Sequence, residues 1–341
     1  MMRRNCYYQG PVSAHFDGQR FFNPGQPSTD KRLRDMLRWR WQSRGLPRWR
    51  HVPVTRPATV PASSQALRVT AIGHASVLIQ LAGYNVLVDP VWSDRVAPFP
   101  FIGPRRWNPA GIALNQLPPI HLILITHNHY DHLDVPTLKT LSAGHSPVVF
   151  APLGNDVIIQ RAIPSLPVTC LDWWDRHVAQ QGSLTITLTP AYHWSARGLR
   201  DRRMALWGGF HLQTPTSSLY IAGDTAFGDG EIFRAISARL GAPDLAILPI
   251  GAYAPRWFMQ AVHMNPDEAV QAMQFLSARR ALGIHWGTFR LTDEDAYEPV
   301  TALSNALTAR SLSPSAFEAL HPGQSLLLPP QFTTHDSASI D

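Results

Sequence analysis

Short apolar runs separated by glycine-containing turns dominate the pattern between residues 67 and 90. The runs at 67–72, 76–81 and 84–90 are rich in β-branched residues, and the short turns between them predict a meander of strands. The connection "AGYN" (82–85) is short enough for a hairpin. Residues 120–126, "IHLILIT", are apolar on both faces, which is typical of a strand buried inside a layered α/β domain.

Strand and helix patterns alternate along the rest of the chain. Helices are predicted at 153–163, 230–241 and 265–280, where Asn265 is a good N-cap and Pro266 occupies the first helical position. The apolar runs predict further strands at 146–152, 183–190, 218–224, 244–251 and 281–287. Meandering strands with interspersed helices predict two β-sheets covered by helices, a four-layer αββα sandwich.

The segment 28–45 has the period of an amphipathic helix that ends at Gly45. Leu33, Met36, Leu37 and Trp41 form one apolar stripe among many arginines. One interpretation is a basic helix that lies on anionic lipid, where each Lys or Arg contributes about 1 kcal/mol. The other is a helix whose stripe packs on its own domain, and the pattern leaves both open.

The chain is expected to divide into three parts. Residues 51–66 are rich in Pro, Ser and Ala without periodicity, as in an extended linker or surface strap. We therefore expect a basic N-terminal extension at 1–66, the main domain at 67–330 and a C-terminal tail at 331–341.

The positive charge is concentrated near the N-terminus. Residues 1–56 hold 12 Lys and Arg against 3 Asp and Glu, a net charge of +9, so the total of +6 leaves −3 for the remaining residues. An enzyme of nucleic acids more often has a basic track around its active site. The charge pattern therefore argues against nucleic acid as a partner.

Apolar runs and cysteines limit the location and the kind of metal site. No run approaches 18 consecutive apolar residues and the N-terminus lacks a secretory apolar stretch, so we expect a cytoplasmic protein and leave peripheral membrane association open. Cys6 and Cys170 are far apart, which excludes a disulfide framework and a thiolate cluster. Any metal must use His and carboxylate ligands.

The stretch "THNHYDHLD" (126–134) carries the strongest chemical signal. It follows a predicted buried strand and places histidines at 127, 129 and 132 and an aspartate at 131. This spacing offers two nitrogens to one cation and a carboxylate plus a nitrogen to a second. The pattern therefore predicts a metal site, in which two ions need more ligands than the loop supplies.

Three residues at other predicted strand ends are candidates for the missing ligands: His193, Asp224 and His285. Taken singly, each also fits a hydrogen-bonded core or turn residue. Taken together, they sit at the same kind of place as the metal loop. Asp224 is suited to bridge two cations roughly 3.5–4 Å apart, the spacing at which a hydroxide between them attacks a phosphoryl or carbonyl centre.

The motif with distant His, Asp and His resembles the metallo-β-lactamase superfamily, whose fold is the αββα sandwich. Further blocks are similar to the N-acylphosphatidylethanolamine-hydrolysing phospholipase D family. They are "RFFNPG", "GHASVLI", "DPVWSDR", "LPPIHLILITHNHYDHLD", "LDWWD", "AGDTAFGD", "PIGAYAPRWFMQAVHMNPDEAV" and "IHWGTFRL". The resemblance spans roughly residues 20–325 and is loosest at 51–66.

The resemblance implies a dinuclear zinc site in a hydrolase domain. By resemblance, one zinc is held by His127, His129 and His193, the other by Asp131, His132 and His285, and Asp224 bridges both. Iron and manganese remain open as alternatives. Asp131, Asp224 and His263 are the residues that the resemblance places in catalysis.

Two further positions and one apolar run carry alternative interpretations. Asp89 either orients a ligand imidazole through its free N–H or only starts the turn before Pro90. His263 either assists protonation or phosphate binding, or is a surface histidine before a helix. Val262 stands where mammalian members have Gln, which puts an amide contact to the lipid head group in doubt. Trp257, Phe258 and Met259 either line an acyl-chain groove or membrane contact, or pack in the core. Tyr130 has no predicted role.

The resemblance implies a phosphodiesterase of the phospholipase D type. A metal-bridging hydroxide would release an N-acylethanolamine from N-acylphosphatidylethanolamine-like lipids and leave phosphatidic acid. The alternatives are a lactonase or sugar-phosphate hydrolase acting on soluble substrates and a non-catalytic envelope-associated zinc protein. Expected partners are the phospholipid and, through the basic helix, an anionic membrane surface; homodimer formation is left open.

Overall fold

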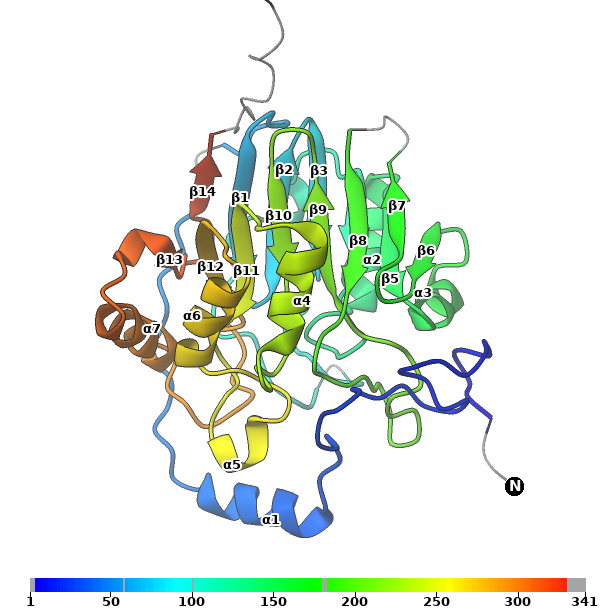
Figure 1. Cartoon of the computed structure of the whole chain (residues 1–341), viewed down its shortest axis with the longest axis vertical. Coiled ribbons are helices and arrows are strands. Elements are labelled where there is room, and N and C mark those ends of the chain that lie inside the picture. The colour runs from blue at the N-terminus through cyan, green and yellow to red at the C-terminus, as the bar shows by residue number, and fades with distance from the viewer. Residues whose placement is uncertain (1–3, 58, 100, 180–182, 330–341) are drawn as a thin grey trace, which may run out of the picture.

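Two seven-stranded β-sheets pack face to face and carry helices on both outer faces in the computed structural model of the chain (Figure 1). The structure describes residues 4–57, 59–99, 101–179 and 183–329, and the predicted tail at 331–341 lies outside them. The expected four-layer αββα sandwich is confirmed.

The first sheet has an antiparallel half and a parallel half. β14, β1, β2 and β3 pair antiparallel, and β3, β4, β5 and β6 pair parallel. The predicted hairpin is confirmed, with Leu81 opposite Tyr84. In sheet order the strands are β14 (Ser325–Leu328), β1 (Leu67–Gly73), β2 (Ser76–Leu81), β3 (Tyr84–Val88), β4 (Leu122–Leu124), β5 (Val148–Pro152) and β6 (Val168–Leu171).

The second sheet repeats this division. β7 to β10 pair antiparallel, and β10 to β13 pair parallel in the order β10, β11, β12 and β13. In sheet order the strands are β13 (Phe317–Glu318), β12 (Arg280–Ile284), β11 (Leu245–Pro249), β10 (Ser218–Ile221), β9 (Gly209–Gln213), β8 (Thr185–Thr189) and β7 (Arg176–Val178). Most strands of both sheets are buried along their length, since the sheets are the two central layers.

The helices form the outer layers. α2 (Val135–Gly144) and α3 (Asn155–Ala162) cover the first sheet, and α4 (Glu231–Leu240), α6 (Pro266–Phe275) and α7 (Glu298–Ala309) cover the second. The predicted start of α6 is confirmed, because the Asn265 side chain accepts a hydrogen bond from the Glu268 N–H in a capping box. Short elements are η1 (Leu114–Gln116), η2 (Pro314–Ala316) and α5 (Arg256–Met259).

The N-terminal residues share the main core. Phe16 and Phe21 are almost fully buried in the apolar cluster between the two sheets. Residues 51–57 and 59–66 contain no helix or strand, and the second of these stretches borders the first sheet, where the Pro61 and Ala62 carbonyls accept hydrogen bonds from Gln80 and Asn85. The boundary expected at residue 66 therefore divides segments that fold together.

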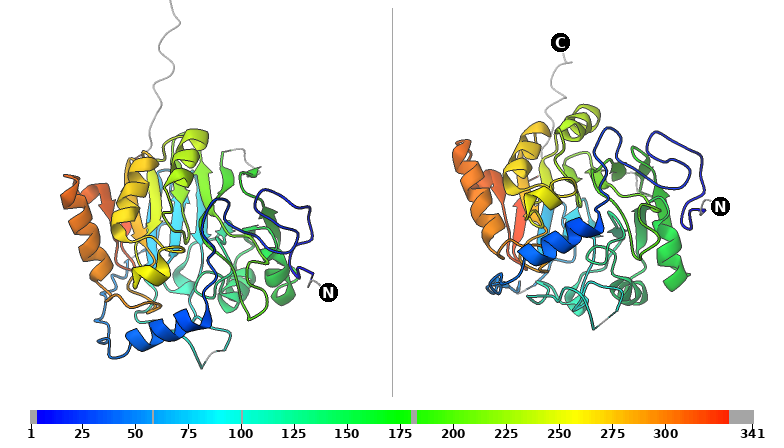
Figure 2. Two further views of the ribbon diagram at one scale, coloured as in Figure 1. Left: turned by 60° about the horizontal axis from the view of Figure 1, so that its bottom comes forward. Right: turned by 90° about the horizontal axis from the view of Figure 1, so that it is seen from below.

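The N-terminal helix is shorter than predicted. α1 spans Leu33–Gln42, not 28–45, because the Asp30 carboxylate accepts hydrogen bonds from Arg202 and Arg203 and holds the preceding residues in an extended loop. α1 lies along the outside of the molecule (Figure 2). Among the described residues, no helix has the length and apolar character needed to cross a membrane.

Candidate metal centre

The predicted ligands come from loops that leave the carboxyl ends of strands in both sheets. The metal loop, residues 126–134, leaves β4 of the first sheet, while His193 follows β8, Asp224 follows β10 and His285 directly follows β12 of the second sheet. Because the two sheets pack face to face, these loops meet at one edge of the sandwich. The structure brings together all seven residues that the sequence nominated as metal ligands.

The first group of candidate ligands consists of three imidazoles and one carboxylate. The Nδ1 atom of His129 lies 2.9 Å from His127 Nε2 and 3.2 Å from His193 Nε2. Asp224 Oδ2 lies 3.8 Å from His127 Nε2 and 3.7 Å from His193 Nε2. A tetrahedral ion with bonds of about 2.0–2.1 Å places its ligand nitrogens roughly 3.3 Å apart, so the group has the dimensions of a tetrahedral metal site.

The second group shares Asp224 with the first. Asp224 Oδ2 lies 3.2 Å from the Nε2 atoms of both His132 and His285. Asp131 Oδ2 lies 3.6 Å from His132 Nε2 and 3.4 Å from His285 Nε2. One carboxylate oxygen therefore faces two ligand groups, as a bridging ligand of a metal pair must.

Several polar atoms at this centre are buried without a hydrogen-bond partner among the described residues. They are His129 Nε2, His132 Nε2, Asp224 Oδ1, His263 Nδ1 and both ring nitrogens of His285. Buried polar atoms normally find partners, and the unpartnered His132 Nε2 and His285 Nε2 both face the Asp224 carboxylate at 3.2 Å, where a shared cation would satisfy them. The residues therefore fit a pair of divalent cations.

The charge of the site also suits cations. Burial lowers the pKa of His129 to about 4 and that of His193 to about 3, which keeps both imidazoles neutral and able to bind metal near pH 7. Burial alone would also lower the pKa of His285, but the carboxylates of Asp224 and Asp131 outweigh it and raise that pKa to about 9. These carboxylates attract positive charge, either as protons or as a bound cation.

Comparison with known proteins decides the family. The beta-lactamase superfamily domain matches residues 84–286. The "N-acyl-phosphatidylethanolamine-hydrolyzing phospholipase D 1" of Caenorhabditis elegans is 38% identical over 77% of this chain and 76% of its own length. The mitochondrial protein of the same description in Saccharomyces cerevisiae is 36% identical over 67% of this chain and 49% of its own.

The chain belongs to the N-acylphosphatidylethanolamine-hydrolysing phospholipase D family of the metallo-β-lactamase superfamily. It is a metal-dependent hydrolase. Among solved structures, an isothiocyanate hydrolase from Delia radicum gut bacteria has a TM-score of 0.60 at 17% identity, and the match covers 77% of this chain and 99% of that one. This likeness shows the fold alone.

Three of the candidate ligand imidazoles are oriented by hydrogen bonds at Nδ1, the ring nitrogen that faces away from the metal position. Asp89 is fully buried, and its Oδ2 accepts hydrogen bonds from His132 Nδ1 at 2.7 Å and from Thr126 Oγ1 at 2.6 Å. Because the Thr126 hydroxyl donates to Asp89, it accepts from His127 Nδ1 at 3.0 Å. His193 Nδ1 donates to the Val262 carbonyl at 2.9 Å. Each bond leaves the opposite ring nitrogen free to bind metal.

Val262 lies in the apolar cluster that includes Trp39 of the N-terminal helix, and the neighbouring His263 lies at the metal centre. His263 is buried, and its Nδ1 lies 4.0 Å from Asp224 Oδ2, so the interpretation as a surface histidine is wrong. The Val262 side chain packs in an apolar cluster with Phe258 and Met259. The interpretation of Phe258 and Met259 as membrane contacts is therefore wrong, whereas the backbone carbonyl at Val262 orients His193 whatever its side chain.

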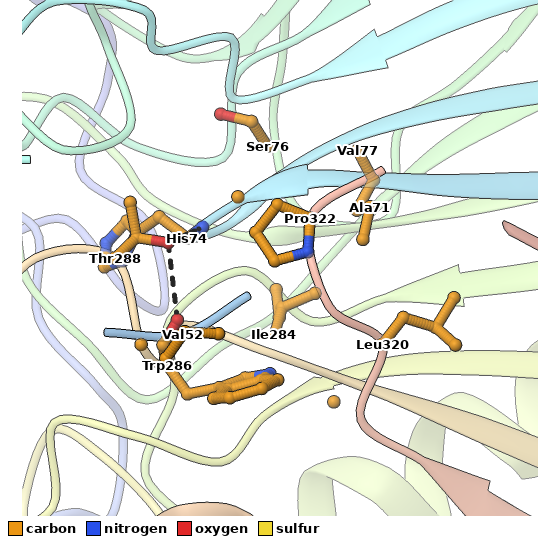
Figure 3. Close-up of a pocket in the computed structure, with 13 residues that line it drawn as sticks. Val52, Ala71, His74, Ser76, Val77, Ile284, Trp286, Thr288, Leu320 and Pro322 are labelled. Carbon is orange, nitrogen blue, oxygen red and sulfur yellow. Dashed lines mark hydrogen bonds between the residues drawn. The ribbon is translucent and has the colours of Figure 1, made fainter. Parts of the chain in front are cut away.

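His74 is a member of the centre that the sequence did not nominate. Its Nε2 donates to Asp131 Oδ2 at 2.9 Å, and its carbonyl accepts from the His285 N–H at 3.0 Å. His74 lies next to Thr288 at a cavity of about 20 Å³ between the two sheets (Figure 3). His74, Asp89 and His285 all have positive φ angles, an uncommon conformation that clusters at functional sites. The block "GHASVLI" contained the only signal for it.

Proposed function

We propose that the chain hydrolyses N-acylphosphatidylethanolamine-like phospholipids to phosphatidic acid and N-acylethanolamine with two zinc ions. The observation that carries the proposal is Asp224 Oδ2, which lies 3.2 to 3.8 Å from four histidine nitrogens, two in each ligand group, in a chain 38% identical to the Caenorhabditis elegans relative. A dinuclear site of this kind is the usual apparatus for phosphodiester hydrolysis. The same His and carboxylate ligands also suit iron and manganese.

The proposed ligand assignment follows the two groups. His127, His129 and His193 hold the first cation, Asp131, His132 and His285 hold the second, and Asp224 bridges them. When bound, such cations supply Lewis acidity at the phosphoryl oxygens and an activated water. The ligand set contains two carboxylates, which compensate at most half of the charge of two divalent cations. The centre therefore keeps the positive charge that an anionic phosphodiester requires.

The remaining residues hold the ligands and face the substrate. Asp89 and Thr126 keep the rings of His132 and His127 in the tautomer that presents Nε2 to metal. His263 is placed to donate a hydrogen bond to a phosphoryl or leaving-group oxygen, because its unpartnered Nδ1 lies beside Asp224.

The activity is tested with N-acylphosphatidylethanolamine in mixed micelles. Released N-acylethanolamine is measured by mass spectrometry for the zinc-loaded protein and for His132→Ala and Asp224→Asn. Both variants should lose at least 10²-fold in rate, whereas His145→Ala, at the end of α2 and outside the ligand groups, should keep it. Turnover confined to soluble lactones or sugar phosphates would replace the proposal with that alternative.

We also propose that α1 contacts an anionic membrane surface. Its stripe faces solvent, with Leu33 71%, Leu37 59% and Trp41 66% exposed, so the alternative that the stripe packs on its own domain is wrong. The helix attaches to the protein through other residues. Trp39 packs on Phe258 with ring centroids 4.7 Å apart. An apolar stripe among arginines that is left unpacked is the pattern of an interfacial helix.

Vesicle sedimentation tests the membrane contact. Binding to phosphatidylglycerol vesicles should exceed binding to phosphatidylcholine vesicles and fall at high salt. Leu37→Ser should weaken binding roughly 10-fold, since it removes about 1.5 kcal/mol or more of apolar burial. Val178→Ser is the matched control, because Val178 is 56% exposed on β7 and outside α1. Equal binding by both variants would refute the contact.

A further inference from the structure

Two loops from different sheets must keep a fixed distance for the first ligand group to exist. The metal loop of the first sheet supplies His127 and His129, and the loop between β8 and β9 of the second sheet supplies His193. The ring nitrogens that face one another across this gap lie 3.2 Å apart. Any sliding of one loop past the other therefore breaks the group.

Hydrogen bonds from Arg197 and Tyr130 connect the two loops, and each of these side chains donates to the backbone of the other loop. Arg197, in the His193 loop, donates from Nη1 to the Asn128 carbonyl at 3.0 Å and to the Leu133 carbonyl at 2.8 Å. Tyr130, in the metal loop, donates its hydroxyl to the Arg197 carbonyl at 2.8 Å. The guanidinium also lies 3.9 Å over the Tyr130 ring, a favourable cation–π contact.

Arg197 is itself held in place by its own loop. The N–H groups of Arg197 and Gly198 donate to the Asp201 carboxylate, the second at 2.8 Å. Tyr7 from the N-terminal segment donates its hydroxyl to Asp201 Oδ2 at 2.8 Å. Burial lowers the pKa of Arg197, although the guanidinium remains charged. The contact is thus made by a half-buried cation that its own loop holds in place.

The two carbonyls that accept hydrogen bonds from Arg197 lie next to candidate metal ligands. Asn128 lies between His127 and His129, and Leu133 follows His132, so Arg197 holds the peptide groups on both sides of the stretch from His129 to His132. Hydrogen bonds to the far ring nitrogen orient His127, His132 and His193, but His129 Nε2 has no such partner among the described residues. The orientation of His129 therefore depends on its backbone and on the packing of its ring against Trp194, whose centroid lies 4.3 Å away.

We propose that Arg197 and Tyr130 are positioning residues for the first metal position, and that they act through the backbone that carries His129. The inference rests on the ligand assignment of the proposed function. It gives Tyr130 a role as a tie between the loops, since its hydroxyl is directed to the Arg197 carbonyl.

Arg106 provides a matched control for a purely structural arginine. It is also half-buried, donates to the Val91 carbonyl and lies 4.9 Å over the Phe289 ring, but it makes no hydrogen bond to the described residues of the metal loop. Removing either guanidinium should cost stability. Only the loss of Arg197 should change one metal position more than the other.

The experiment measures two zinc dissociation constants for the full chain by competition with a chelator. Arg197→Met should weaken one position 10- to 100-fold, the range seen when a residue supporting metal ligands is lost. Tyr130→Phe keeps the ring under the guanidinium and should weaken the same position about fivefold. Arg106→Met should leave both constants unchanged. A His285→Ala background, which leaves the first group intact, identifies the weakened position as the first.

The possible results distinguish a failure of this inference from a failure of the proposed function. Wild-type protein that binds no zinc would overturn the ligand assignment and the inference together. Wild-type protein that binds two zinc ions, with Tyr130→Phe binding both as tightly, would overturn the inference alone. Equal weakening of both positions would do the same, because it is the result of a general loosening. If Arg197→Met fails to fold, Tyr130→Phe decides.

Discussion

Replacing Asp89 by asparagine tests how the ligand imidazoles are oriented. The Asp89 carboxylate accepts three hydrogen bonds, from the Thr126 N–H at 2.8 Å, from the Thr126 hydroxyl at 2.6 Å and from His132 Nδ1 at 2.7 Å. Asp89→Asn keeps the shape but turns one oxygen into a donor. Because every group facing the side chain is a donor, either orientation of the amide opposes one of them.

The expected effect is larger on the second metal position than on the first. A hydrogen bond to a charged group contributes about 1.5–3 kcal/mol, and loss of an orienting partner costs about 10- to 100-fold in metal affinity. His132 bonds Asp89 directly, so the second position should weaken by that factor. His127 senses Asp89 only through Thr126, so the first position should weaken less.

Metal content after dialysis and competition with a chelator provide the assay, and Asp134→Asn provides the control. Asp134 is a buried carboxylate of the same loop that accepts hydrogen bonds from Trp92, Ser93 and Thr137 and belongs to neither ligand group. Asp134→Asn should lower stability and keep both zinc affinities. Equal affinities in Asp89→Asn and Asp134→Asn would refute the orienting role of Asp89.

Three further changes probe the backbone, the protonation and the His263 loop. Gly223→Ala should lower the free energy of unfolding by about 1–3 kcal/mol in denaturant titrations, because φ is +62° and a Cβ would lie 2.7 Å from the Thr126 side chain. Gly25→Ala is the control and should lower it less, because φ is +71° but no atom lies near the added Cβ. Burial lowers the pKa of His129 from 6.5 to about 4, so between these pH values the unfolded chain binds a proton that the folded chain does not. The free energy of unfolding of chelator-treated protein should therefore decrease as pH falls from 6.5 to about 4. A free energy of unfolding that does not change over this interval would contradict the prediction. Arg256→Lys removes the two hydrogen bonds to the Glu268 carboxylate and the bond to the His263 carbonyl, so the rate of hydrolysis should drop about tenfold while zinc is retained. Arg310→Lys is the control and should keep the rate, because its ion pair is with Asp267 on α6.

Much of the fold could be predicted from the sequence because the patterns that specify its strands and helices are local. The strands at 67–72, 76–81 and 84–90 and the capped start at Asn265 depend on hydrophobic period and turn chemistry within a few residues, and the structure confirms them. The helix expected within the segment 28–45 is shorter than that segment, and Asp30 beside its start is held by arginines about 170 positions away. No local pattern reports such a contact.

The candidate site divides in the same way. The spacing of His127, His129, Asp131 and His132 by itself determined that a metal pair was the best hypothesis, because a short loop forces these side chains to converge. Only the tertiary structure decided that His74 joins Asp131, that the Val262 carbonyl orients His193, and that Tyr130 meets Arg197. These contacts join loops of two sheets, and their distances are set by how the sheets pack. The sequence specifies that packing through the whole core, and no short segment of it encodes the result.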